Sequence, residues 1–353
     1  MFLVGEYTRL PAWVPARAGD GIAALYPTED GGWAEKCVCS IENPSYVIPD
    51  GEDGLYAVSE TEQGAIAHLI RTEDGTYRED AFLRFPGSGS CHLCLEQETR
   101  RVFVSNYNSG SLVVVDGHPG AMKVLQELRY SGCGPDPKRQ EAPHIHSSWL
   151  SPNGKELFVA DLGTDRIYRY LLGKEIPLTP NARQPWITCP PGSGPRHMVF
   201  HDTMPLAYVT TEMGNQVLLI RFDQENIGTV CEGWSTAEEK NGLILTAHLQ
   251  LSLKYGMLYV SVRGTDEICW FRVEPSTGRL TPGGKCPAGG RFPRHFLLDE
   301  ESGLLLVANQ LSGSVCVFSL GADGTVSAQP LQSIPAPGAA VIVKTEDKGN
   351  TRK

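Results

Sequence analysis

Residues 293–318 read PRHFLLDEESGLLLVANQLSGSVCVF, and this pattern recurs along the chain. It contains a short apolar strand, a turn, a second strand that ends near a polar residue, a glycine-containing turn and a third strand. Period-two alternation bounded by Gly, Asn, Asp and Pro predicts β-strands joined by tight turns. The pattern recurs in stretches that begin at Pro44, Ser90, Pro143, Pro195 and Ala247.

The polar residue after the second strand marks the period of the repeat. It recurs every 46 to 55 residues, at Glu60, Asn106, Asp161, Glu212, Arg263 and Asn309. Glu6, in LVGEYT, adds a seventh unit with the same local pattern. A period of about 40–50 residues with several short strands is typical of propeller blades. The sequence therefore predicts an all-β, seven-bladed β-propeller.

The two ends of the chain complement each other. The first unit lacks its opening apolar strand, and residues 335–344, PAPGAAVIVK, have the pattern of that missing strand. We expect this C-terminal strand to close the N-terminal blade, because closure removes a long open sheet edge. One propeller domain over residues 1–353 is the prediction.

Composition excludes several classes of function. The net charge of −10 argues against a nucleic-acid partner and against an anionic membrane surface. The N-terminal segment has no signal-peptide pattern, and no long apolar run predicts a membrane span. The ten cysteines lack the spacing of a disulfide framework, so we expect free thiols and a cytoplasmic protein. Cys91 and Cys94 form a single CxxC, which we interpret as two thiols on an inner strand.

Histidines gather at one position of the repeat. Counting back 14 or 15 residues from the polar column gives Tyr46, His92, His146, His197, His248 and His295, with Ala339 in the closing strand. The opening strand of each unit is expected to line the central channel. Two interpretations remain open: hydrogen bonds that tie neighbouring blades together, or groups that titrate near neutral pH and take part in chemistry. No metal-ligand spacing is present, so no metal site is predicted.

Four residues from three successive units form the candidate catalytic site. Arg263 interrupts an apolar strand and needs a partner, and Glu212 in TTEMGN is the obvious carboxylate. His146 and Arg196 lie on the expected inner strands of the adjoining units. Together they offer a proton carrier, a carboxylate and two guanidinium groups that can bind an anion or stabilise an oxyanion. A small anionic substrate and ester opening or closing are predicted, and no serine nucleophile motif occurs.

At these residues the chain resembles the lactonase family of β-propellers. The resemblance rests on DLGTDRIYRY, GPRH and VANQ and covers nearly the whole sequence. That family contains propeller-type 6-phosphogluconolactonases and fungal 3-carboxy-cis,cis-muconate lactonizing enzymes. The resemblance implies that His146, Arg196, Glu212 and Arg263 are catalytic, and the interval of 16 residues from Arg196 to Glu212 matches the family.

The PRHF segment around Arg294 is similar to the bacterial lactonase branch. The resemblance therefore implies hydrolysis of 6-phosphoglucono-1,5-lactone in the pentose phosphate route, without a cofactor. Arg294, His197 and His295 are expected to hold the phosphate, and His92 and His144 complete the candidate substrate-binding set.

Two other functions remain as alternatives. The same four residues would serve a cycloisomerase that closes a carboxymuconate to its lactone. A non-catalytic interaction platform is the other, because a propeller fold by itself does not establish an enzyme. Segments 118–142 and 223–245 are predicted rim loops that would gate the pocket or bind a partner. The sequence indicates no oligomeric state.

Overall fold

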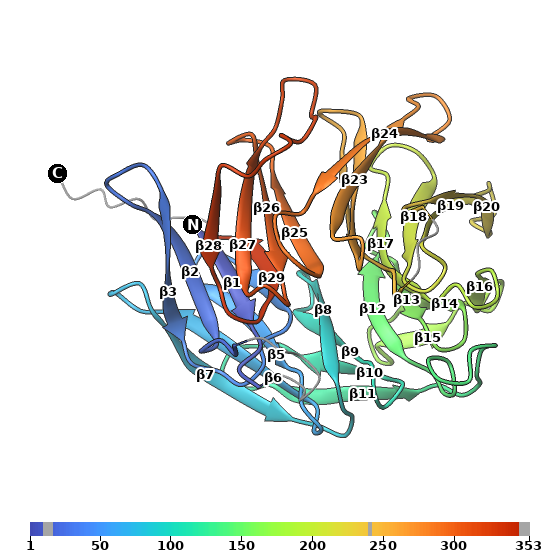
Figure 1. Ribbon diagram of the computed structural model, residues 1–353. Helices are drawn as coiled ribbons and strands as arrows, with labels where there is room; N and C mark the ends of the chain where they lie inside the picture. Colours follow the sequence, from blue (N-terminus) through green and yellow to red (C-terminus); the bar gives the residue numbers. More distant parts are fainter. Residues whose placement is uncertain (10–16, 239–241, 346–353) are drawn as a thin grey trace.

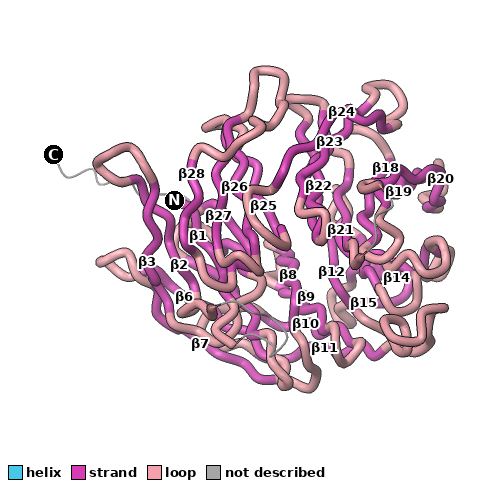
Figure 2. Tube along the Cα trace, in the orientation of Figure 1, coloured by secondary structure: helices cyan, strands magenta, loops and turns pink. Residues whose placement is uncertain are grey.

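The computed structural model describes residues 1–9, 17–238 and 242–345. Over these ranges the chain forms seven antiparallel sheets arranged in a ring (Figure 1). Figure 2 shows strands and loops, and within the described ranges no helix is long and apolar enough to cross a membrane. The predicted seven-bladed β-propeller is confirmed.

The first four blades, each written from its innermost strand outward, comprise β29 (Ala339–Lys344), β1 (Phe2–Glu6), β2 (Ile22–Pro27) and β3 (Trp33–Cys39); β4 (Val47–Asp50), β5 (Gly54–Ser59), β6 (Ala65–Arg71) and β7 (Tyr77–Arg84); β8 (Ser90–Glu96), β9 (Arg101–Asn106), β10 (Ser111–Asp116) and β11 (Lys123–Arg129); and β12 (Ile145–Leu150), β13 (Glu156–Asp161), β14 (Arg166–Leu172), with β15 (Leu178–Pro180) and β16 (Trp186–Thr188) both paired to β14. The last three blades comprise β17 (Pro195–Phe200), β18 (Leu206–Thr211), β19 (Gln216–Phe222) and β20 (Gly228–Ser235); β21 (Leu245–Ser252), β22 (Met257–Arg263), β23 (Glu267–Val273) and β24 (Leu280–Pro287); and β25 (Pro293–Asp299), β26 (Leu304–Asn309), β27 (Ser314–Ser319) and β28 (Gln332–Pro335).

The C-terminal strand closes the ring as predicted. β29 pairs antiparallel with β1, with Phe2 opposite Lys344 and Val4 opposite Ile342. The innermost strands β4, β8, β12, β17, β21, β25 and β29 contact one another in succession around a closed circle. We call the region that they enclose the central channel.

The hydrophobic core lies between neighbouring blades. All six residues of β9 are buried, and Val102 and Val104 pack with Tyr56 and Val58 of the preceding blade. A middle strand is covered on both faces, which is why it reads as a continuous apolar run. Burial of each such side chain stabilises the fold by about 1.5–3 kcal/mol. Cys91 and Cys94 lie on β8 as free thiols, as expected.

The turn after the second strand has one conformation in five blades. The ladder between the second and third strands ends at Asn106, Asp161, Thr211, Val262 and Asn309. A four-residue turn follows, and its last residue has a positive φ at Gly110, Asp165, Asn215, Asp266 and Gly313. Gly, Asn and Asp are the residues that tolerate this conformation. The first residue of these turns is therefore Tyr107, Leu162, Glu212, Arg263 and Gln310.

This register corrects the predicted polar column, which combines two structural positions. Glu212 and Arg263 are the first residues after the ladder, whereas Asn106, Asp161 and Asn309 are its last residues. The side chain of Asp161 is turned into the blade, where it accepts hydrogen bonds from the backbone N–H groups of His144 (2.7 Å) and Gly163 (2.9 Å). A column of polar letters does not distinguish a side chain that fastens the turn from one that leaves it.

The histidine column also needs a correction, because a β-bulge shifts one member. In β8, β17 and β25 the bulge inserts one residue before His92, His197 or His295. In β12 the inserted residue is His146 itself. His146 therefore occupies the position of Cys91, Arg196 and Arg294, one residue before the other histidines. A bulge re-aims the inserted side chain, so His146 belongs with the arginines.

Candidate active site

Glu212 is a buried carboxylate held by three guanidinium groups. Its Oε2 accepts hydrogen bonds from Arg263 Nη2 at 2.7 Å and from Arg196 Nε at 3.0 Å. Its Oε1 accepts a hydrogen bond from Arg139 Nη2 at 2.6 Å. Glu212, Arg196 and Arg263 are each 4% exposed or less. The predicted association of Glu212 with Arg196 and Arg263 is present.

Each of these side chains is positioned by a different feature of the fold. Arg196 is the bulged residue of β17, Arg263 ends β22, and Glu212 opens the turn after β18. Gly264 follows Arg263 with φ of +92°, and a Cβ there would lie 2.0 Å from the carbonyl oxygen of Leu243. The turn that presents Arg263 therefore requires glycine.

The electrostatics keep Glu212 ionised. Burial by itself raises its pKa, but Arg263, Arg196, His146 and Arg139 outweigh burial and hold the pKa well below the usual value. The pKa of Arg196 falls to about 9 because of burial and the nearby Arg263. Arg196 Nη1 is buried and has no hydrogen-bond partner among the described residues. This donor remains available for an anionic or carbonyl oxygen.

His146 borders the carboxylate. Its Nε2 lies 3.9 Å from Glu212 Oε2, and its Nδ1 is buried with no hydrogen-bond partner in the described part of the chain. Burial and the positive charge of Arg196 hold the pKa of His146 well below its usual value. The imidazole is therefore neutral at pH 7, which makes it a proton acceptor.

Tyr107 and Arg139 belong to the same cluster, although neither was predicted. Arg139 Nη2 lies 3.3 Å from Tyr107 Oη, and the edge of the Tyr107 ring meets His146 with the two centroids 5.7 Å apart. Tyr107 has the same turn position as Glu212, three residues before a residue with positive φ (Gly110 and Asn215). That spacing is the signal by which Tyr107 can be found. Arg139 lies in the long segment between β11 and β12, where the repeat gives no register.

His144 and Arg294 lie on different sides of the cluster. His144 stacks on Tyr107 with ring centroids 4.5 Å apart, and its Nδ1 is 3.0 Å from the Tyr107 carbonyl oxygen. Arg294 Nη2 lies 3.6 Å from Glu60 Oε2, which also accepts a hydrogen bond from Tyr7 Oη at 2.6 Å. Tyr7 and Glu60 also line a cavity of about 560 Å³ that extends outward from this pair.

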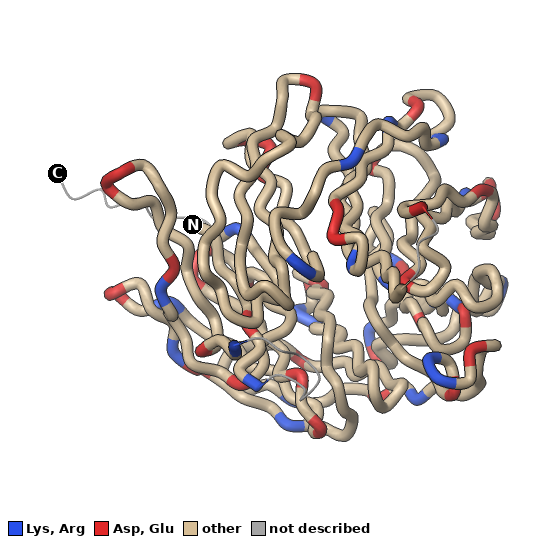
Figure 3. Tube along the Cα trace, viewed as in Figure 1, with Lys and Arg blue, Asp and Glu red and all other residues tan. Residues whose placement is uncertain are grey.

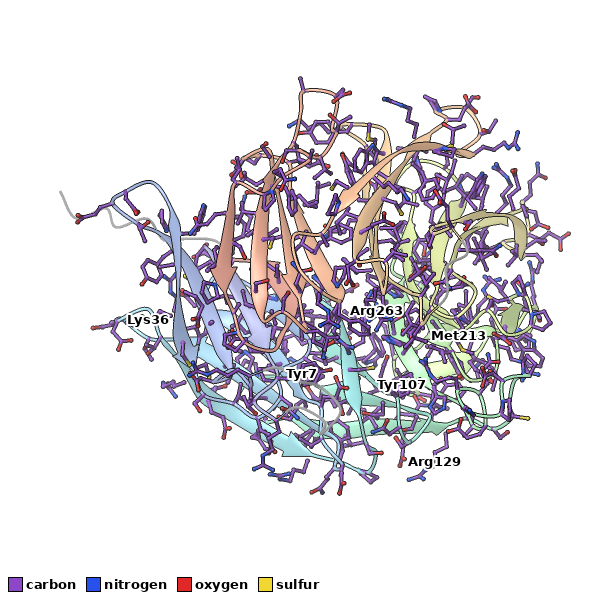
Figure 4. The ribbon with its side chains drawn as sticks, viewed as in Figure 1. Tyr7, Lys36, Tyr107, Arg129, Met213 and Arg263 are labelled. Atoms are coloured by element: carbon purple, nitrogen blue, oxygen red, sulfur yellow. The ribbon has the colours of Figure 1, made fainter. Side chains whose placement is uncertain are left out.

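The site is positively charged although the protein is acidic. Four arginines (139, 196, 263 and 294) and two ionised glutamates (60 and 212) give 4 − 2 = +2. Figure 4 shows Tyr7, Tyr107 and Arg263 toward the middle of the ring, with Lys36 and Arg129 at its periphery. In Figure 3 acidic and basic positions are interspersed over the outer strands and loops. The arginine cluster therefore lies in the central part of the molecule.

The other predicted histidines form a ring inside the channel. His197 contacts His92, His146 and His248 with centroid distances of 5.4, 5.4 and 5.2 Å, and His248 stacks on His295 at 3.9 Å. Burial holds the pKa values of His92, His197, His248 and His295 below the usual value.

Two of these histidines join neighbouring blades, as the structural interpretation expected. His92 Nδ1 accepts a hydrogen bond from the backbone N–H of Ser148 (3.4 Å), and His295 Nδ1 accepts one from Ile342 (3.3 Å). His248 and His295 also line a separate cavity of about 710 Å³ at the far ends of the innermost strands. No group of three or more His, Cys, Asp or Glu suited to a metal ion was found within residues 1–9, 17–238 and 242–345.

Known proteins share this architecture. The family described as "Lactonase, 7-bladed beta-propeller" matches residues 1–344. The chain belongs to the lactonase family of seven-bladed β-propellers. A 6-phosphogluconolactonase from Bacillus subtilis (strain 168) is 27% identical over 333 residues, with 89% of each chain covered. A 6-phosphogluconolactonase from Formosa agariphila is 30% identical and covers 80% of this chain and 82% of its own.

Solved structures agree with the sequence comparison. The periplasmic gluconolactonase of Pseudomonas aeruginosa has a TM-score of 0.85 and 27% identity, with 97% of this chain and 98% of that chain covered. A Lactobacillus plantarum protein has a TM-score of 0.86 and 26% identity, over 97% and 98% of the two chains. The resemblance inferred from DLGTDRIYRY, GPRH and VANQ is confirmed at the level of the family.

Proposed function

We propose that this lactonase hydrolyses 6-phosphoglucono-1,5-lactone. The observation that carries the proposal is a neutral imidazole beside an ionised carboxylate and a buried guanidinium with an unused donor. His146, Glu212 and Arg196 form this arrangement. The net charge of +2 around it suits the phosphate of the substrate, which carries close to two negative charges at neutral pH. The names of the relatives from B. subtilis and F. agariphila support the same substrate.

The reaction follows from the protonation states. His146 Nδ1 takes a proton from water, and the hydroxide adds to the lactone carbonyl carbon. Arg196 and Arg263 stabilise the negative charge that develops on the carbonyl oxygen. The tetrahedral intermediate then breaks its bond to the ring oxygen, which takes the proton back from His146 and leaves as a hydroxyl group. Water is consumed, and the product is the open-chain hydroxy acid.

Glu212 acts as a fixed negative charge in this scheme. Its pKa is held too low for it to exchange a proton near pH 7. It stabilises the imidazolium of His146 while that group carries the proton, and it orients Arg196 and Arg263. Arg294 is proposed to bind substrate at the opposite side of the site. We assign His92, His197 and His295 chiefly to holding the blades together, because their ring contacts are with one another and with neighbouring strands.

The setting of the enzyme is part of the proposal. We infer that it acts in the cytoplasm, in the pentose phosphate route, with no cofactor. Ten free cysteines support a reducing compartment. Residues 1–353 are proposed to fold as one domain, because β29 and β1 join the two ends of the chain in one sheet.

The test is lactone hydrolysis by the purified protein with the spontaneous opening subtracted. The variants His146→Ala and Arg263→Ala are expected to lower kcat/KM by about 100-fold or more. His118→Ala and Arg129→Ala are matched controls, because both side chains are exposed and distant from Glu212. Unchanged rates in both site variants would overturn the site. Conversion of a carboxymuconate in place of the sugar lactone would favour the cycloisomerase.

A further inference from the structure

Arg139 differs from the other two arginines that hold Glu212. Arg196 and Arg263 project from blade strands and are buried, whereas the side chain of Arg139 comes from the segment between β11 and β12 and is 33% exposed. It therefore lies on the solvent side of the carboxylate. A substrate entering from solvent meets Arg139 before it meets the two buried guanidinium groups.

The segment that carries Arg139 is firmly built into the fold. The next residue, Gln140, is fully buried, and its Nε2 donates to Leu162 O at 2.8 Å and to Asp165 Oδ1 at 2.9 Å. The backbone N–H of Arg139 donates to Asp136 Oδ1 at 3.0 Å. The guanidinium thus projects from a backbone that needs no ordering when a ligand binds, which favours affinity.

Arg139 has donors and charge that the protein itself does not use. Its hydrogen bonds to Glu212 and Tyr107 both come from Nη2. Nε and Nη1 make no hydrogen bond with the described residues, and a guanidinium offers five N–H donors in all. Arg196 and Arg263 already exceed the single negative charge of Glu212. The charge of Arg139 is therefore available to an anionic ligand.

The distance between Arg139 and the proposed base suits the two ends of a sugar-phosphate lactone. Tyr107 lies between them, with its hydroxyl group at Arg139 and its ring edge at His146. One tyrosine side chain is comparable in length with the span from the lactone carbon of a hexose to its 6-phosphate. A lactone carbonyl beside His146 thus places the phosphate within reach of Arg139.

We infer that Arg139 is a specificity-determining residue that binds the phosphate of the substrate through its unused N–H donors. This inference rests on the proposed lactonase function. It assigns to the segment predicted as a rim loop a role in selecting phosphorylated over unphosphorylated lactones. A guanidinium binds phosphate with two parallel hydrogen bonds, which lysine cannot reproduce.

The experiment compares two substrates that differ in the phosphate. kcat/KM is measured for 6-phosphoglucono-1,5-lactone and for glucono-1,5-lactone, and their ratio gives the selectivity. Arg139→Ala is expected to lower this ratio by about tenfold or more, with the loss mainly in KM for the phosphorylated lactone. Arg139→Lys is expected to give an intermediate ratio. Lys138→Ala, on the same segment, is the control and should keep the wild-type ratio.

Two results would overturn the inference. One is an Arg139→Ala variant with the wild-type ratio, and the other is a ratio that falls in Arg294→Ala but not in Arg139→Ala. If the wild-type protein hydrolyses neither lactone, the proposed function fails, and calorimetric binding of 6-phosphogluconate and gluconate then decides the inference. Weaker binding of 6-phosphogluconate alone by Arg139→Ala supports it, and equal binding of both ligands by variant and wild type contradicts it.

Discussion

At the scale of single residues, Glu212 determines the charge balance of the site. A buried carboxylate alone would take up a proton, because burial disfavours its charged form. Three arginines reverse that preference, and Glu212 in turn makes the burial of Arg196 and Arg263 tolerable. The cluster therefore depends on every member, and removal of one leaves the others with uncompensated charge.

The variant Glu212→Gln tests this dependence. It leaves two buried guanidinium groups without a negative partner, so we expect the free energy of unfolding to fall by about 3–5 kcal/mol. Urea unfolding measures the change. Glu301→Gln is the control, because its partner Lys344 and Glu301 itself are exposed and such pairs contribute about 0–1 kcal/mol. A loss of less than 1 kcal/mol in Glu212→Gln would contradict the charge balance described here.

The pH dependence of the reaction tests the role of His146. A base is active when it is unprotonated, and the pKa of His146 is held well below its usual value by burial and by Arg196. We therefore expect kcat at saturating substrate to stay level as the pH falls from 8 through 6.5, the range in which an ordinary histidine would lose activity. A midpoint near 6.5 in the kcat profile would exclude His146 as this base.

At the scale of elements, the turn after each second strand determines which side chains reach the site. Its last residue needs a positive φ, and counting back three residues from it gives Tyr107, Glu212 and Arg263. β1 ends with a different kind of carboxyl group. Glu6 lies opposite Ala339 of β29, and its pKa is raised to about 8 by burial, with smaller contributions from Glu35 and Asp20.

Glu6 makes the closure of the ring sensitive to pH. In the unfolded chain Glu6 loses its proton near pH 4.5, whereas in the folded chain it keeps the proton to about pH 8. The folded state binds more protons across this window, so the stability that Glu6 contributes is lost as the pH rises. We expect Glu6→Gln to gain stability relative to wild type from pH 5 to pH 8, by up to about 4 kcal/mol. Urea unfolding at the two pH values measures the gain, and a constant difference would contradict it.

At the scale of the whole molecule, closure of the ring and the field of the site act together. Seven sheets enclose a cluster of net charge +2 in a protein of net charge −10. Low-dielectric walls around a charged cleft concentrate its field, which raises the local concentration of an anionic substrate. This field requires a complete ring, because an open blade would admit water to the channel.

Truncation tests the closure. A chain that ends at Gly338 lacks β29 and exposes the edge of β1, so we expect it to lose cooperative unfolding and all lactonase activity. A chain that ends at Thr345 keeps β29 and is the control, and it should retain both. Near-ultraviolet circular dichroism and urea unfolding detect the difference. An unfolding midpoint of the shorter chain equal to that of the control would show that β29 is dispensable.

Much of the fold and part of the site were predictable from local pattern. Strand alternation and turn residues recur with the blade, so seven units, their order and the strand exchange between the two ends follow from the sequence. Arg196, Glu212 and Arg263 could be grouped because each occupies a nearly fixed place in successive repeats. The contact between His146 and Glu212 was also expected, although the repeat position assigned to His146 was one residue out.

The sequence by itself determined which blades adjoin and which side chains the inner strands carry, because strand periodicity is a local property of the chain. Tertiary structure alone decided the bulge that separates His146 from the histidine ring, since one extra residue leaves the letter pattern almost unchanged. It also decided the arrival of Arg139 at Glu212. That residue lies in a segment without a repeat, and its position follows from the buried hydrogen bonds of Gln140 to residues of the next blade.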